Sequence, residues 1–396
     1  MDPAADRFGA RRLLPHDAVI HRAEGAWLYD VDGHRYLDCL NVASAALQGH
    51  SHPRVMRAMA EQAARMTLST RAVANDHLPP LLERLERLTH HDVVVVRHSS
   101  ADALAVALEV ARQVANSRKG ISLSAGHVVA CKGNGLGIGG WPAAELARYP
   151  RAVVTPQPGY SLVRFGDADA LAHAITPDTV AFVVEPLQAT DGFECPPEGY
   201  LASVEAICRQ HDVLLVIDET QTGLGRTGHL LASRAEGVRG DLVLLGKALS
   251  SGFYPVAAVA ASGDCGQVLR TVPHDAAFTS NPLGCAVACA ALDVIVDEDL
   301  PSRARALGRE LLEMLRAIKS PYVREIRGRG LWVSIQLTCH AHAFNEALMD
   351  SGVAVNDAHD TTIRLSPTLT VNRAELAWLV DRVARVLDDR SLKSPA

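Results

Sequence analysis

The sequence lacks the features that mark membrane and nucleic-acid-binding proteins. Its apolar stretches are interrupted well short of the roughly 20 residues that a membrane-spanning helix needs, and its first residues contain no hydrophobic signal core. The formal net charge is −6 and no long basic run is present, so nothing favours nucleic acid as a partner. We therefore expect a cytoplasmic protein with no membrane or nucleic-acid partner.

Cysteine pairs with metal-ligand spacing are also absent. The eight cysteines are scattered without a CxxC motif, which predicts free, buried thiols rather than disulfides or a metal site. His50 and His52 have no third ligand at a suitable spacing, and we interpret them as turn residues. A composition of 48% hydrophobic and 21% charged residues is typical of a soluble globular protein, and 396 residues suffice for two domains.

Two apolar runs end on ionisable residues. Residues 213–217 read VLLVI and precede Asp218, and residues 242–245 read LVLL and precede Gly246 and Lys247. Uninterrupted aliphatic runs are typical of strands buried on both faces of a parallel sheet. Ligands of open α/β sheets bind beyond the carboxyl ends of the strands, so both ionisable side chains should face that crevice.

This pair of opposite charges has two interpretations. Asp218 and Lys247 could form a structural ion pair at the sheet edge. Alternatively, they belong to a pyridoxal 5'-phosphate (PLP) site, in which Lys247 forms a Schiff base with the cofactor and Asp218 keeps the pyridine nitrogen protonated. The neighbouring segments must decide between the two.

A candidate phosphate site lies earlier in the chain. Residues 93–96 predict a strand, and RHSSAD leads from it into a helix over 101–115. Ser99 and Asp102 fit a capping box. The free N–H groups of the helix start, with the hydroxyls of Ser99 and Ser100, would also bind a phosphate dianion. Capping alone explains the serines equally well.

Two further ionisable residues occupy informative places. A third apolar run, over 181–184, ends on Glu185. After about residue 297 the pattern changes to a smaller α+β unit, in which Arg364 lies inside a strand predicted over 362–366. An arginine there is either salt-bridged to the protein or a clamp for a substrate carboxylate.

The order of these elements resembles a known family. Eight motifs carry the resemblance: DVDGHRYLD, QGHSHP, VVEPLQ, VIDETQTGLGRTG, LLGKALSSGFYPVAAV, NPLGCAVACAALDV, IRGRGL and IRLSPTL. Together they resemble the class III aminotransferases of PLP fold type I, and most of all the ornithine δ-aminotransferases, over nearly the whole chain.

The resemblance implies an α/β fold with a mostly parallel central sheet flanked by helices, plus a smaller α+β domain. We expect an N-terminal segment over 1–50 that packs with the small domain, a large PLP-binding domain over 51–296 and a C-terminal small domain over 297–396. Sites of this fold type form where two subunits meet, so the resemblance also implies a homodimer with active sites at its interface.

Individual roles follow from the same resemblance. Lys247 matches the Schiff-base lysine, Asp218 matches its pyridinium partner, and Arg364 matches the arginine that binds a substrate carboxylate. The remaining cofactor-binding candidates are Ser99, Ser100 and Ala101 at the phosphate, Gln221 at the phenolic oxygen, and Cys131, Glu185 and Thr279.

Several positions depart from the family pattern. The aromatic residue that stacks on the PLP ring is replaced by Cys131 and its neighbour by Lys132, a nearby arginine is Asn134, and two pocket tyrosines are Ala43 and Ala74. These changes remove volume and charge contacts, so we expect a wider, differently charged substrate pocket. Lys132 becomes a candidate acid/base group if burial lowers its pKa. The alternative is that the loop around it faces solvent.

Two more departures concern a switch and the subunit interface. The family's switch glutamate aligns with Thr190, so Arg364 should be freer to hold an α-carboxylate permanently. The threonine that reaches the neighbouring subunit's phosphate aligns with Ala277, and Thr279 is its candidate substitute.

The sequence therefore predicts a PLP-dependent enzyme that acts on an amino-acid-type substrate, an aminotransferase-like enzyme of specialised metabolism. A wider pocket leaves open elimination, replacement or C–C bond formation on a larger amino acid such as S-adenosylmethionine. A noncatalytic homologue is the third alternative. Retention of Lys247 and Asp218 argues against it, because the fold needs neither.

Overall fold

The computed structural model describes residues 18–69, 74–135, 159–189, 192–271, 279–355, 357–359, 361–389 and 391–392 of the chain. Two predicted positions, Thr190 and Ala277, lie outside these described residues.

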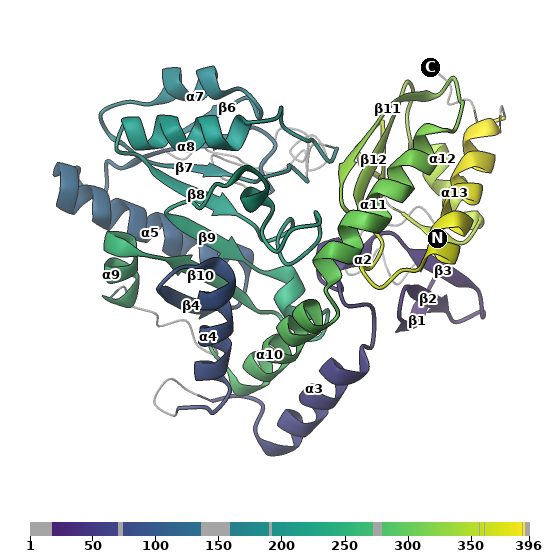
Figure 1. Cartoon of the computed structure of the whole chain (residues 1–396), viewed down its shortest axis with the longest axis horizontal. Coiled ribbons are helices and arrows are strands. Elements are labelled where there is room, and N and C mark those ends of the chain that lie inside the picture. Colours follow the sequence, from purple (N-terminus) through teal and green to yellow (C-terminus); the bar gives the residue numbers. More distant parts are fainter. Residues whose placement is uncertain are drawn as a thin grey trace, which may run out of the picture.

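A seven-stranded sheet forms the centre of the large domain (Figure 1). Its strands, in spatial order, are β4 (Val93–Arg97), β10 (Ala257–Ala261), β9 (Leu242–Leu245), β8 (Leu214–Asp218), β7 (Thr179–Val184), β5 (His127–Cys131) and β6 (Tyr160–Val163). β10 is antiparallel to both of its neighbours, whereas the other pairs are parallel. The predicted mostly parallel sheet is confirmed, and every residue of β8 and β9 is buried.

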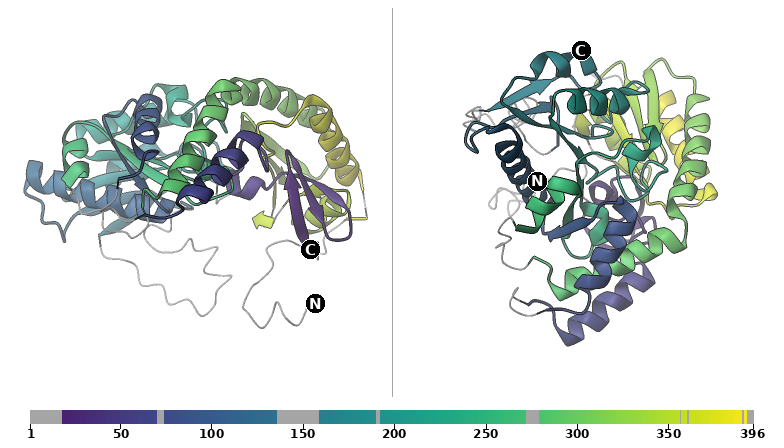
Figure 2. Two further views of the ribbon diagram at one scale, coloured as in Figure 1. Left: turned by 90° about the horizontal axis from the view of Figure 1, so that it is seen from below. Right: turned by 60° about the vertical axis from the view of Figure 1, so that its left-hand side comes forward.

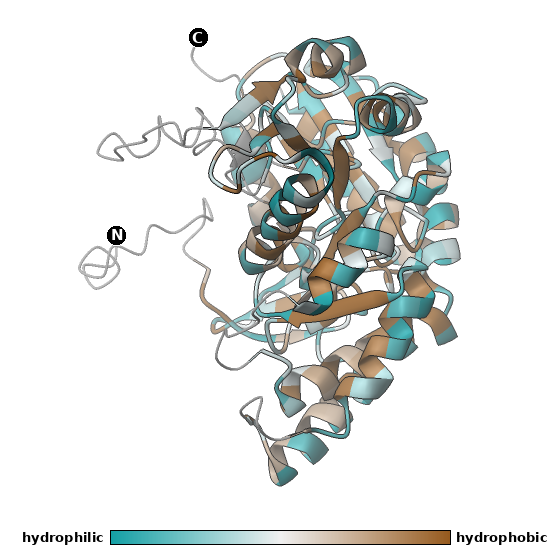
Figure 3. Ribbon diagram, turned by 90° about the vertical axis from the view of Figure 1, so that its left-hand side faces the viewer, coloured by the Kyte–Doolittle hydropathy of each residue, from teal (hydrophilic) through white to brown (hydrophobic). Residues whose placement is uncertain are grey.

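Helices cover the central sheet. One face packs against α5 (Ser100–Lys119) and α9 (Gly263–Thr271), and α8 (Tyr200–Gln210) packs on β8 with α7 (Ala168–Ala174) beside it. α10 (Pro282–Asp297) packs on α3 (Pro53–Arg65) and α4 (Leu78–Thr89). Figure 3 shows the strands of the sheet as largely hydrophobic between helices of mixed hydropathy. The valine-, leucine- and alanine-rich strands therefore form the core that positions the site.

The small domain is built around a four-stranded antiparallel sheet of β11 (Val323–Arg329), β12 (Trp332–Leu337), β15 (Thr362–Leu365) and β14 (Asp357–His359). It is covered by α11 (Leu300–Arg316), α12 (His342–Asp350) and α13 (Arg373–Asp388). The N-terminal strands β1 (Ile20–Glu24), β2 (Trp27–Asp30) and β3 (Arg35–Asp38) pair antiparallel in that order, and β3 pairs in parallel with β13 (Val353–Ala354). Figure 2 shows these strands beside the small domain.

Several strands that are short or lie at sheet edges were not predicted from the sequence. β11 reads VREIRGR and is only partly buried, because a strand at the edge of a sheet carries charged residues that discourage pairing with other chains. Its pattern is therefore not the apolar run of a central strand. Among the described helices, none is both long and apolar enough to cross a membrane.

Gly308 of α11 lies where this helix packs closely on the sheet of the small domain. A Cβ atom at Gly308 would lie against the backbone carbonyl of Gly330, in the turn between β11 and β12. Gly308→Ala should therefore lower the free energy of unfolding by about 1–3 kcal/mol through overpacking, measured by thermal and urea denaturation.

Gly120→Ala is the matched control, because Gly120 has a positive φ of 70° but open space around its Cβ position. It should cost only the strain of a left-handed residue, about 1–2 kcal/mol, without altering small-domain packing. Equal stability of Gly308→Ala and the wild type would contradict the close approach.

Candidate active site

Asp218 and Lys247 lie side by side at the carboxyl edge of the central sheet. β8 ends at Asp218, and the neighbouring parallel strand β9 is followed by Gly246 and Lys247. Asp218 is 3% exposed. Lys247 has a φ of 40°, in the left-handed region that a lysine rarely occupies. Such strained residues concentrate at functional sites.

Burial determines the charge state of this pair. Burial raises the pKa of Asp218, although the backbone N–H of Thr220 donates a 2.9 Å hydrogen bond to its Oδ1 and opposes the shift. Burial lowers the pKa of Lys247, against the attraction of Asp218 and Glu185, and the charge of Arg364 lowers it further. The lysine is therefore biased toward the neutral amine, the form that acts as a nucleophile or base.

Glu185 completes the ionisable cluster. It follows β7, which pairs with β8, and it is 4% exposed. Burial, reinforced by the negative charge of Asp218, raises the pKa of Glu185 to about 8. Its Oε2 accepts a 3.1 Å hydrogen bond from the N–H of Gly135. Glu185 thereby ties the chain after β5 to the edge that carries Lys247.

A cavity of about 410 Å³ opens beside Lys247 and is also lined by Ser99, Ser100 and Tyr254. The Ser99 side chain accepts a 3.1 Å hydrogen bond from the N–H of Asp102, which confirms the predicted helix cap. The N–H groups of Ser100 and Ala101 have no partner within the helix because they belong to its first turn. The cavity thus lies between an amine and a helix start whose N–H groups could bind an anion.

Gly246 brings the lysine close to that helix end. A Cβ atom at Gly246 would lie 3.0 Å from Ser100 Oγ. A larger residue at position 246 would therefore require the Ser100 hydroxyl to move.

Two other predicted cofactor-binding residues lie in the segments that follow β8 and precede α10. Gln221 is half-buried in the turn after β8, and Thr279 is buried at the start of the described segment before α10. Both assignments stay predictions.

The residues after β5 differ in burial. Cys131 is buried, with its Sγ 3.6 Å from Tyr200 Oη of α8. Asn134 is also buried, and its Nδ2 donates to the carbonyl of Cys131 at 2.9 Å. Lys132 is exposed, so the burial on which its acid/base role was argued is not found. The roles of these residues remain predictions.

The two predicted pocket alanines are exposed. Ala43 belongs to α2 (Asn41–Ser44), whose four residues all have positive φ values. Asp38 holds this left-handed turn, because its Oδ1 accepts hydrogen bonds from the N–H groups of Leu40 and Asn41. Ala74 is exposed just before α4.

Arg364 projects from β15 of the small domain, and its guanidinium carbon lies 4.8 Å from the ring centroid of Phe193. Sequence reasoning missed Phe193. Arg226, in the turns after β8, is fully buried and donates to the carbonyls of Leu331 and Pro367 at 2.9 and 2.6 Å. It therefore joins the large domain to the small one.

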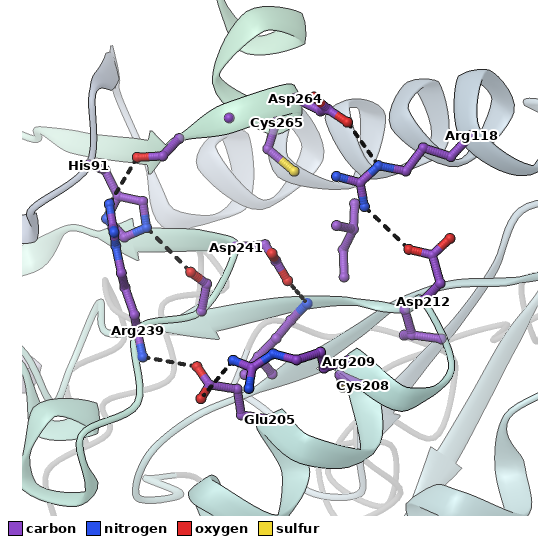
Figure 4. A pocket seen from close by; sticks show the side chains of 16 residues that line it. His91, Arg118, Glu205, Cys208, Arg209, Asp212, Arg239, Asp241, Asp264 and Cys265 are labelled. Carbon is purple, nitrogen blue, oxygen red and sulfur yellow. Dashed lines mark hydrogen bonds and ion pairs between the residues drawn. The ribbon is translucent and has the colours of Figure 1, made fainter.

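A second cavity, of about 420 Å³, lies at the opposite edge of the sheet (Figure 4). Arg118 lies there 3.3 Å from Asp212 and 3.0 Å from Asp264, and Arg209 lies 3.4 Å from Glu205. Arg118 thereby links α5 to α9 and to the turn after α8, whereas Arg209 and Glu205 both belong to α8. The cavity begins where β8 and β9 begin, so it is remote from Lys247.

Comparison with known proteins agrees with this geometry. The family model described as aminotransferase class-III matches residues 8–137 and 147–387. The chain is a class III aminotransferase. It is therefore a PLP-dependent transferase of fold type I.

Relatives of this class III aminotransferase match it over nearly its whole length. It is 44% identical over 393 residues to the ornithine aminotransferase of Bordetella pertussis, covering 98% of this chain and 95% of that protein. The ornithine aminotransferase of Bacillus subtilis is 38% identical over 382 residues, covering 96% and 95%.

Solved structures give the same result. The ornithine aminotransferase of Toxoplasma gondii has a TM-score of 0.91 and 34% identity, covering 97% of this chain and 93% of that one. The acetylornithine aminotransferase of Elizabethkingia anophelis has a TM-score of 0.87 and 33% identity, covering 97% of each chain.

The residues of the aminotransferase site fit PLP. Lys247 would supply an amine for the aldehyde, Asp218 would supply a carboxyl group for the pyridine nitrogen, and the helix start at Ser99 and Ser100 would supply donors for the phosphate. The cavity beside Lys247 joins the amine to these donors. The chemistry of this donor set therefore matches the family's cofactor.

The buried carboxyl of Glu185 should make stability depend on pH. Its pKa is raised from 4.5 to about 8 in the fold, so the folded state holds a proton that the unfolded state has lost. The free energy of unfolding should therefore fall as pH rises from about 5 to 8. In Glu185→Gln, this contribution to the decrease in the free energy of unfolding should be absent.

The measurement is the Tm of the cofactor-free wild type and variant between pH 5.5 and 8.5. Over this pH range the Tm of the wild type should fall further than the Tm of the variant. The difference should be roughly 2–4 °C for each kcal/mol that the proton on Glu185 contributes to stability. Parallel pH profiles of the two proteins would show that Glu185 does not carry this proton.

Proposed function

We propose that this protein transfers the amino group of an α-amino acid whose side chain is bulkier than that of ornithine, in a biosynthetic pathway of specialised metabolism and in the cytoplasm. The observation that carries the proposal is the buried cluster of Lys247, Asp218 and Glu185 beside a cavity with an anion-binding helix end. The alignment of Ala43 and Ala74 with pocket tyrosines of the family supports a wide pocket, because neither alanine fills the space of a tyrosine. The names of the relatives support amino-group transfer from an ornithine-type donor.

Each residue has a distinct role in the proposed reaction. When bound, PLP withdraws electrons from the carbon that carries the substrate's amino group. Lys247 Nζ would take a proton from that carbon and deliver it to the former aldehyde carbon of the cofactor, which its bias toward the neutral amine favours. Asp218 holds a proton at the pyridine nitrogen, and Arg364 binds the substrate carboxylate through its fork of N–H donors.

Lys247 provides the first test. Lys247→Ala should lose the visible absorbance band that lysine-bound PLP gives and lower the rate of amino-group transfer by at least about 10³-fold, because it removes both the attachment point and the base. Lys132→Ala is the matched control and should keep the band. Turnover by Lys247→Ala at a wild-type rate would contradict the assignment.

The donor class is tested by a half-reaction. The holoenzyme is mixed with L-ornithine, L-lysine, L-methionine, S-adenosylmethionine or L-glutamate, and conversion to pyridoxamine phosphate is followed by absorbance. We expect conversion by at least one donor, with a larger rate constant for a donor bulkier than ornithine. Loss of donor without any pyridoxamine phosphate would contradict amino-group transfer.

A homodimer is part of the proposal. Met56 of α3, Met66 directly after it and Leu68 are 40%, 38% and 43% exposed, and exposed apolar side chains are the material of association surfaces. Leu68→Glu should shift the protein toward monomer, because it places a charge in an apolar contact.

The measurement is the mass in solution by light scattering. The wild type should have twice the mass of one chain. Leu123→Glu is the control, since Leu123 is 48% exposed near the end of α5, and it should stay dimeric. A monomeric wild type at micromolar concentration would contradict the dimer.

A further inference from the structure

One face of the small-domain sheet carries a row of side chains across three strands. Arg327 of β11, Ser334 of β12 and Arg364 of β15 are register partners. Directly opposed residues of neighbouring strands point to the same face. Trp332 lies two residues before Ser334 and therefore shares that face.

Residues 192–194 of the large domain dock on this row. Arg327 donates to the carbonyl of Phe193 from Nε and to the carbonyl of Gly192 from Nη2, both at 3.2 Å. Its Nη2 also lies 2.6 Å from Glu194 Oε1. Gly192 has a φ of 90°, and a Cβ there would lie 3.1 Å from Thr362 Oγ1. The backbone is thus held firmly against the small domain.

The Phe193 ring contacts both Trp332 and Arg364. Its centroid is 4.6 Å from that of Trp332, in an edge-to-face arrangement at 84°, and 4.8 Å from the guanidinium carbon of Arg364. Phe193 is 8% exposed and has a φ of 57°. A bulky residue rarely adopts that conformation, and such strain persists where the surrounding structure imposes it.

The segment that carries Phe193 is also linked to the part of the chain beside Lys247. Gln188 lies three residues after Glu185, and its N–H and carbonyl form hydrogen bonds with the backbone of Glu194 at 3.0 and 2.9 Å. Glu185 contributes to the charge environment of Lys247. The chain therefore runs from the lysine end of the site to the ring that contacts Arg364.

We propose that Phe193 is a positioning residue that holds the Arg364 guanidinium in place for the carboxylate of the amino-acid substrate. An aromatic face attracts a cation through its quadrupole. It has no acceptor oxygen, so it orients the arginine without competing for a carboxylate's place on the N–H donors. This inference rests on the carboxylate-binding role proposed for Arg364.

Removal of the ring should weaken amino-acid binding without changing the chemical step. The apparent Kd and limiting rate of the half-reaction are measured for the best of L-ornithine, L-lysine and L-methionine, and for its carboxylate-free counterpart, 1,4-diaminobutane, 1,5-diaminopentane or 3-methylthiopropylamine. In Phe193→Leu the Kd of the amino acid should rise roughly three- to tenfold. Its limiting rate and the Kd of the amine should change less than twofold.

Three variants separate positioning from general damage. Phe193→Tyr keeps the ring and should stay within twofold of the wild type. Phe165→Leu removes an aromatic side chain that pairs with Tyr200 instead, and it should bind the amino acid normally. Phe193→Met replaces the leucine variant if that variant does not fold or loses its PLP absorbance.

The outcomes distinguish the two proposals. If Arg364→Lys raises the amino-acid Kd at least tenfold and Phe193→Leu leaves it unchanged, the positioning role is wrong and the proposed function stands. If Arg364→Lys also leaves it unchanged, the carboxylate-binding role itself is wrong. An equal loss for amino acid and amine, or no rescue by tyrosine, would show a merely structural role for Phe193.

Discussion

The burial of three ionisable groups at one edge of a parallel sheet is the constraint on which the rest of this structure depends. An isolated buried charge is costly, so burial shifts the pKa of Asp218, Glu185 and Lys247 toward the neutral form of each group, and the attraction of Lys247 to the two carboxyl groups opposes that shift. The three groups lie together because β7, β8 and β9 are adjacent and parallel, which brings three strand ends to one place. The left-handed conformation of Lys247 adds strain that the buried strands must support.

The small domain is joined to the large domain by hydrogen bonds from arginines to backbone carbonyls. Arg226, fully buried, bonds to backbone carbonyls of the small domain, and Arg327 of the small domain bonds to residues 192–194 of the large one. Arginines thus fasten the domains from both sides. The ring of Phe193, from the large domain, supports Arg364, the residue proposed to bind the substrate carboxylate.

The sequence was sufficient where a single physical rule dominates. Aliphatic runs that end on Asp218, Glu185 and Lys247 predicted buried parallel strands, and Ser99 predicted a helix cap that the structure confirms. It was insufficient where distant segments meet. Phe193 is one aromatic residue in a turn-rich stretch, and only the register of β12 and β15 brings Trp332 and Arg364 beneath it. Likewise, exposure of Lys132 depends on how the chain leaves β5, which no local pattern specifies.

Chemical mapping of the cofactor linkage tests the central claim most directly, namely that the buried amine of Lys247 is where PLP attaches. The holoenzyme is reduced with borohydride, which fixes PLP on its lysine, and digested for mass spectrometry. The account predicts one stoichiometric adduct, on the peptide that contains Lys247. An adduct on Lys132 or another lysine in its place, or the absence of any adduct in protein saturated with PLP, would contradict it.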